Sequence, residues 1–190
     1  MKKSPDKIVV AFVLILVIPV LGYLNIGLIP AYIFLVGFFG GFILWLSSTS
    51  ETAWESIKWP YFLTMAMFAI HRVDEQVSGF FDEMEKLTGV PYPDTVTVEG
   101  VLITLFSLFW LLSPLFIIKK KWYGYLGAWT VFAAMGVSEL AHFVFPLFTP
   151  GPYGYFPGMI TVVPLAPVAW WGMWRLWHSK PTTPTTPSDG

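Results

Sequence analysis

Long apolar runs, separated by short polar segments, dominate the pattern of hydrophobic and polar positions along this chain. A helix that crosses about 30 Å of hydrocarbon needs about 20 residues, and the runs approach that length. They predict six transmembrane helices, over residues 8–24, 29–46, 59–80, 100–118, 122–145 and 158–177. The predicted fold class is therefore all-α, a polytopic membrane helix bundle.

A very short turn at residues 25–27 joins the first two runs, so residues 1–50 are predicted to form a transmembrane hairpin. The next four runs predict a four-helix membrane domain over residues 51–178, and the Pro/Thr-rich residues 179–190 predict a disordered tail. Gly37 and Gly41 lie four residues apart in the second run, a spacing typical of close helix packing.

Composition agrees with this interpretation, because 55% of the residues are apolar and only 12% are charged. A soluble domain is nearer one quarter charged. The net charge of −1 indicates no nucleic-acid partner, and the lack of cysteine excludes disulfides and thiolate ligands. The expected surroundings are membrane lipids.

The distribution of Lys and Arg predicts the orientation. With both termini cytoplasmic, Lys86 is the one basic residue clearly outside, and Arg72 lies within the membrane. We expect the chain in the inner (plasma) membrane of a bacterium. The basic residues predicted on the cytoplasmic side are Lys2, Lys3, Lys7, Lys58, Lys119, Lys120, Lys121, Arg175 and Lys180.

The third run contains four ionisable residues in the segment HRVDE: His71, Arg72, Asp74 and Glu75. A charge at the centre of a bilayer costs roughly 2.5–3.5 kcal/mol on insertion scales, so such residues are functional candidates. On a helix His71 shares a face with Asp74, at i+3, and with Glu75, at i+4.

The fifth run repeats this chemistry, because Glu139 and His142 are spaced i,i+3 in GVSELAHFVF. Glu99 opens the fourth run. Counting about 1.5 Å per residue from the cytoplasmic side places all these groups in the outer half of the membrane. We therefore expect them to converge on one site.

Paired carboxylate–histidine motifs on facing helices hold metals in di-iron and di-manganese bundles, and imidazole with carboxylate also suits zinc. The sequence predicts a divalent metal site, zinc or iron, with His71, Glu75, Glu139 and His142 as ligands. Asp74 or Glu99 is then a further ligand or a catalytic general base. The simpler alternative is a structural polar core, in which Arg72 pairs with Glu75 and the other groups hydrogen-bond between helices.

The motifs IHRVDE, AHFVFP and YFPGMITVVPLAP together resemble the HXXEE-motif membrane proteins. His71, Asp74 and Glu75 match the family's His-x-x-Glu-Glu, with Asp in place of the first Glu, and Glu139 stands where Asn is common, three residues before His142. The third motif is matched by Tyr155, Pro157, Gly158 and Thr161. The resemblance covers about residues 59–177 and implies a shared polar site within the membrane.

A second resemblance, over fewer residues, is to sterol isomerases of the emopamil-binding type. His71, Glu75 and Glu99 match their His-x-x-x-Glu helix and the Glu that opens the next helix. That resemblance implies carbocation stabilisation by carboxylates, a His and a Trp, without metal.

Three functions stay open on these residues. The first is a metal-dependent membrane enzyme, a hydrolase or oxidoreductase, acting on an apolar or lipid-like substrate. The second is a metal-free isomerase of a sterol or isoprenoid. The third is an accessory subunit whose partners are other membrane subunits.

Overall fold

The computed structural model describes residues 3–48, 52–91 and 98–178, without the side chains of residues 25–26 and 98–103. Within these ranges the chain forms seven α-helices and two short 3₁₀ helices, and no strand. The all-α prediction is confirmed. The α-helices are α1 (Pro5–Ile26), α2 (Leu28–Ser47), α3 (Trp54–Ser78), α4 (Phe80–Thr88), α5 (Val98–Ile118), α6 (Trp122–Val137) and α7 (Met159–His178); the 3₁₀ helices are η1 (Ser138–Phe143) and η2 (Phe145–Phe148).

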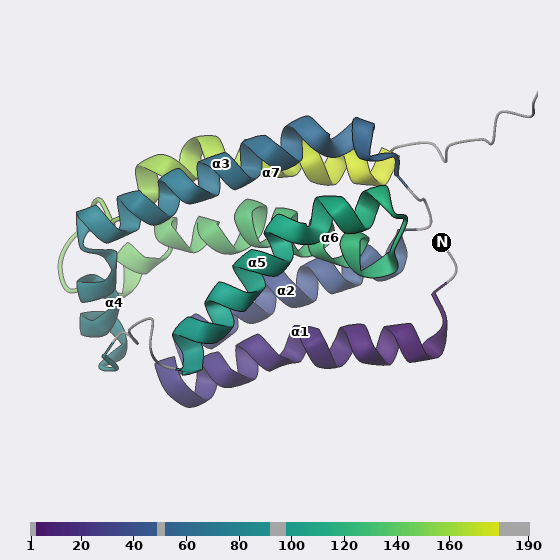
Figure 1. The fold of residues 1–190 in the computed structure, drawn as a ribbon. Coiled ribbons are helices and arrows are strands. Elements are labelled where there is room, and N and C mark those ends of the chain that lie inside the picture. Colours follow the sequence, from purple (N-terminus) through teal and green to yellow (C-terminus); the bar gives the residue numbers. More distant parts are fainter. Residues whose placement is uncertain (1–2, 49–51, 92–97, 179–190) are drawn as a thin grey trace, which may run out of the picture.

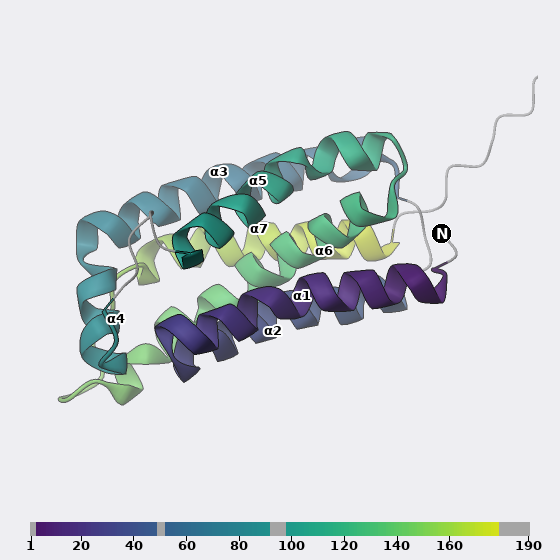
Figure 2. The same cartoon turned by 60° about the horizontal axis from the view of Figure 1, so that its bottom comes forward.

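The six long helices run roughly along one axis as an up-and-down bundle, and the short helix α4 lies across one end (Figures 1 and 2). The opposite end holds the start of α1, the end of α2, the start of α3, the turn between α5 and α6 and the end of α7. The bundle therefore has one end closed by α4 and one end without it.

The predicted hairpin is present as α1 and α2. Gly27 joins them in a positive-φ conformation (φ 100°) that side chains with a Cβ rarely adopt. The prediction of close packing is confirmed too. A Cβ on Gly41 would lie 2.6 Å from Thr130 Cα, and one on Gly37 would lie 2.9 Å from Ala134 Cα, both on α6.

Helix α6 is the centre of the bundle, since every residue from Gly124 to Gly136 is buried. Small residues on α6 let its neighbours approach closely, and one core cluster joins it to residues of α1, α2, α3, α5 and α7. Because α6 runs through the interior, the segment that continues from it also emerges in the interior. That segment is η1, which carries Glu139 and His142.

The membrane prediction is supported most directly in the hairpin. Within the described residues, Pro5–Leu24 and Leu28–Ser47 are the two helices long and apolar enough to cross a membrane. Only 28% and 39% of these stretches are buried, unlike the core helix of a soluble protein. A shorter apolar helix, Thr104–Ile118, lies in α5.

Two of the predicted runs have a different local structure. The run over residues 122–145 is not one α-helix, because the α-helix ends at Val137 (φ −127°, ψ −52°) and 3₁₀ turns follow. The helix predicted over residues 59–80 is α3, which begins earlier, at Trp54, and ends at Ser78. Gly79 (φ 79°) then turns the chain into α4, a helix that the sequence interpretation did not separate. The predicted tail over residues 179–190 lies outside the described residues.

Candidate metal centre

The first half of the site comes from the last two turns of α3. The His71 side chain is fully buried and that of Glu75 is 3% exposed. Their i,i+4 spacing directs both into the bundle, as the sequence predicted. Glu75 also pairs with Arg72, whose Nη1 lies 2.5 Å from Glu75 Oε2. One oxygen of this carboxylate is therefore occupied, and Oε1 faces the site.

The second half comes from η1. A 3₁₀ helix has three residues per turn, so side chains at i and i+3 eclipse. Glu139 and His142 have this spacing and project together toward α3. The turn is anchored by Ser138, whose hydroxyl donates to the carbonyl oxygen of Ile33 on α2 at 3.0 Å.

Four short separations join the donor atoms, two of them within the halves and two between the halves. His71 Nε2 lies 3.5 Å from Glu75 Oε1 and 3.3 Å from Glu139 Oε2. His142 Nε2 lies 3.4 Å from each of the same two oxygens. Each residue thus offers one ligand atom, and the four atoms all lie within 4.8 Å of one another.

Hydrogen bonds on the far side of each imidazole fix its tautomer. His142 Nδ1 lies 2.6 Å from the carbonyl oxygen of Pro157, which only accepts, so Nδ1 carries a proton. His71 Nδ1 lies 2.7 Å from Thr161 Oγ1, and the hydroxyl proton goes to Asp74 Oδ2 at 2.8 Å or to Gly158 O at 3.0 Å. His71 Nδ1 is therefore also a donor, and in neutral imidazoles both Nε2 atoms direct lone pairs inward.

This arrangement fits a metal ion. Around zinc, with ligands at about 2.0–2.1 Å in a regular tetrahedron, neighbouring ligand atoms are about 3.3–3.4 Å apart. Four of the six separations between the ligand atoms, 3.3–3.5 Å, are close to those edges, and the other two lie within 4.8 Å. Two imidazole lone pairs facing two carboxylate oxygens repel one another unless a cation lies between them. The predicted ligand set, His71, Glu75, Glu139 and His142, could hold a metal ion.

The chain segment before α7 forms one wall of this site. A Cβ on Gly158 (φ 89°) would lie 2.5 Å from His142 Nδ1 and 3.0 Å from His71 Cε1. Only glycine lets the backbone approach both imidazoles this closely. Pro157 and Thr161, from the third sequence motif, supply the outer hydrogen bonds described above. From the sequence these positions are recognisable only as part of a motif, because the role of a backbone carbonyl or of a close backbone approach depends on the folded structure.

The two residues predicted as catalytic are placed differently. Asp74 is partly buried and its Oδ2 accepts from Thr161, so it supports His71 through a hydroxyl and is not among the four clustered residues. Glu99 lies in the first turn of α5, and its side chain lies outside the described residues.

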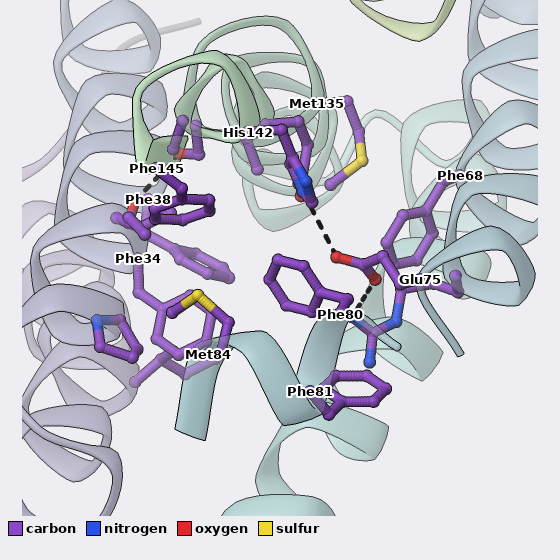
Figure 3. A pocket seen from close by; sticks show the side chains of 18 of the residues that line it. Phe34, Phe38, Phe68, Glu75, Phe80, Phe81, Met84, Met135, His142 and Phe145 are labelled. Atoms are coloured by element: carbon purple, nitrogen blue, oxygen red, sulfur yellow. Dashed lines mark hydrogen bonds and ion pairs between the residues drawn. The ribbon is translucent and has the colours of Figure 1, made fainter. Parts of the chain in front are cut away.

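An apolar cavity of about 230 Å³ borders the site (Figure 3). Glu75, Glu139 and His142 are part of its lining, whereas His71 is not. The rest of the wall is mainly apolar and includes eight aromatic residues, which come from α2, α3, α4, α5 and η2. The site therefore has a closed side at His71 and an open side toward the cavity.

Comparisons with known proteins add no relative. No known protein family, no functionally characterised protein and no solved structure matches this chain significantly. The chemistry of the site is therefore the basis on which its function is inferred.

Proposed function

We propose that this protein is an integral membrane metalloenzyme that acts on an apolar or lipid-like substrate. The observation that carries the proposal is the inward-facing donor set of two Nε2 atoms and two carboxylate oxygens beside an apolar cavity. Donors that repel one another call for a cation, and a cavity next to three of them gives a substrate access. A purely structural metal site has no need of such a cavity.

The surface supports the membrane part of the proposal. Large apolar side chains are exposed on α1, α2, α3, α5 and α7, among them Val9, Tyr32, Phe62, Leu111 and Ile160, and α6 exposes Val137 at its end. A soluble monomer rarely exposes so much apolar surface. We propose that all six long helices span the membrane, with α4 at the outer face.

The charge distribution supports the orientation. Lys3, Lys58, Lys121 and Arg175 belong to segments at the end of the bundle without α4, whereas Lys86 lies on α4. Basic residues collect on the cytoplasmic side of membrane proteins. In this proposed orientation the metal centre lies toward the outer leaflet, and we propose the inner membrane of a bacterium as its location.

The donor set favours zinc or ferrous iron, since imidazole and carboxylate suit both. When bound, the metal supplies a Lewis acid that polarises a substrate oxygen or activates water, which suits a hydrolase; iron also supports oxidation. The protein's own groups have separate tasks. Thr161 and Asp74 hold the His71 tautomer, Arg72 fixes Glu75, and the aromatic wall excludes water from the open side.

Membership of the HXXEE-motif family is part of this proposal. Residues from all three motifs lie at one site: His71 and Glu75 from the first, Glu139 and His142 from the second, and Thr161 from the third. Distant segments that converge in this way support the resemblance, since each motif alone is short.

A metal-free isomerase of a sterol or isoprenoid is the second candidate. It is favoured by the same separations of 3.3–3.5 Å, which also suit ion pairs between protonated imidazoles and carboxylates. Trp110 lines the same cavity as Glu75, Glu139 and His142, and an aromatic ring can stabilise a cation.

The experiment that separates the two candidates is a turnover screen. The full chain, purified in detergent, is incubated with total bacterial membrane lipid, and consumed and formed species are measured by mass spectrometry. We expect conversion that is lost after exhaustive chelation, restored by zinc or ferrous ion, and absent in His71→Ala. Conversion that survives chelation would overturn the metalloenzyme and favour the isomerase.

A further inference from the structure

The cavity beside the metal centre restricts which lipid can react there. Its wall includes Phe34 and Phe38 of α2, Phe106 and Trp110 of α5, and Met84 of α4. In Figure 3 Phe34 and Met84 lie on the side of the cavity away from Glu75. A molecule that fills the cavity thus has an apolar part against the hairpin and α4 and a polar end at the metal.

The volume limits the apolar part to one chain. A methylene group is close in size to a water molecule, which takes about 30 Å³ in the liquid, so 230 Å³ holds about eight such groups. Two long acyl chains do not fit this space. Aromatic walls on several sides suit a single alkyl or isoprenoid chain.

The charges limit the polar end. Glu75 and Glu139, 3% and 20% exposed, carry two negative charges at the inner end, which a divalent ion balances. Arg72, 38% exposed, pairs with Glu75, and the exposed Glu85 adds a negative charge at the rim, so with a divalent ion the charged residues that line the cavity sum to zero. A charged headgroup would disturb this balance in a medium where an unpaired charge is costly.

We propose that the substrate is an uncharged lipid with a single apolar chain and an oxygen-bearing polar end, and that Phe34 limits the chain length. The oxygen faces Glu75, Glu139 and His142, because zinc and ferrous ions in nitrogen–oxygen sites bind and polarise oxygen. The first eight or so carbons lie along the aromatic wall toward Phe34. The charge balance rests on the proposed function, since it requires a bound divalent metal.

The N-terminal hairpin thereby gains a role in specificity. Phe34 is on α2, and its ring approaches α1, since a Cβ added to Gly22 would lie 3.0 Å from Phe34 Cδ2. Truncating Phe34 would open the far end of the cavity without touching any of the four ligands. Phe62 on α3 is a matched control, because it is 54% exposed, its ring packs on Trp54 and it does not line the cavity.

The test is photolabelling of the full chain in phosphatidylcholine nanodiscs by an octanol derivative with a diazirine at its terminal carbon. Labelled residues are mapped by mass spectrometry. Octanol, octanoate and octylamine compete at equal membrane concentration, followed by alcohols of 6 to 14 carbons. Metal content is measured in the same samples.

We expect labelling of α2 and α4 near Phe34 and Met84, and competition by octanol at concentrations at least 10-fold lower than octanoate or octylamine. Phe34→Ala should move the best competitor about three carbons longer, in keeping with the volume of the lost ring. Phe62→Ala should leave the length preference of wild type unchanged.

Labelling confined to lipid-facing residues, equal competition by the charged compounds, or the same length preference in Phe34→Ala would overturn the proposed substrate class. If metal is bound in those samples, such a result contradicts the proposed substrate class and leaves the proposed metal centre in place. If no metal is bound, the proposed function fails, and the charge balance that selects an uncharged substrate fails with it.

Discussion

The two ends of the bundle use polar side chains in different ways. At the end without α4, donors bond to backbone carbonyls of neighbouring segments: Lys3 to Leu46, Thr52 to Leu176, Tyr125 to Thr52 and Arg175 to Ser56, at 2.9–3.2 Å. At the other end four ionisable side chains face one another, and their outward atoms are held by further hydrogen bonds.

The difference separates polar groups that join helices from polar groups arranged around a ligand. A donor that meets a carbonyl is satisfied and needs nothing more. Two imidazoles and two carboxylates whose acceptors turn inward are satisfied by a bound metal ion or by protons on the imidazoles. Substitutions at the two ends should therefore have different consequences.

The largest effect is expected from removing the carboxylates. Glu75→Gln combined with Glu139→Gln keeps the shape of both side chains but removes both negative charges from the centre. We expect metal affinity to fall more than about 100-fold, because even residues behind the ligands are worth 10–100-fold. Competition with a fluorescent zinc chelator measures the change. Glu85→Gln, the same exchange at the exposed rim, should retain wild-type affinity.

A large effect is also expected from Gly158→Ala, which fills the space that both imidazoles need. The new Cβ would lie 2.5 Å from His142 Nδ1. The left-handed backbone conformation of an alanine would destabilise the fold by about a further 1–2 kcal/mol. Metal content should drop and the thermal unfolding temperature should fall. Gly151→Ala is the control, since Gly151 also has a positive φ (115°) but a Cβ there meets nothing within 4 Å. Equal metal loss in both variants would contradict this account.

An intermediate effect is expected from Thr161→Val, which removes the hydroxyl between His71 and Asp74 and keeps the shape. Metal affinity should weaken about 10–100-fold, as for other groups that orient a ligand. Thr161→Ser should restore it. Thr130→Val removes another buried hydroxyl, which bonds Trp110 and Gly127 away from the site, and should leave affinity unchanged.

The smallest effect is expected at the other end of the bundle. Thr52→Val removes a hydroxyl that donates to Leu176 O, and should lower the free energy of unfolding by about 1 kcal/mol. Metal content should stay at the wild-type level. Loss of metal in this variant would mean that the two ends are not independent.

Much of the helical bundle could be predicted from the sequence. The apolar runs predict the long helices, and the glycine spacing predicts that the second run packs closely against another helix, since such patterns are local. The break at Val137 was not predictable, because an apolar run does not distinguish α from 3₁₀ turns. Helix α4 was missed because its apolar residues continue the run of α3, and only Gly79 marks the boundary.

The four candidate ligands of the site could be predicted from the sequence, whereas the hydrogen bonds and the cavity around them could not. His71, Glu75, Glu139 and His142 were identified because ionisable residues at helical spacing are conspicuous in apolar runs. The role of Asp74 depends on Thr161, 87 residues away in the chain, and such a pairing arises only from folding. The cavity likewise depends on α2 and α4 packing beside α5, so no single segment indicates it.

The most direct test of the central claim is the metal content of the full chain in detergent, measured by inductively coupled plasma mass spectrometry. Wild type is compared with His71→Ala on α3 and His142→Ala on η1, and circular dichroism confirms that the helices persist. We expect a stoichiometric metal in wild type that is lost in both variants. No metal in wild type, or full retention in either folded variant, would contradict the claim that these two segments form one metal centre.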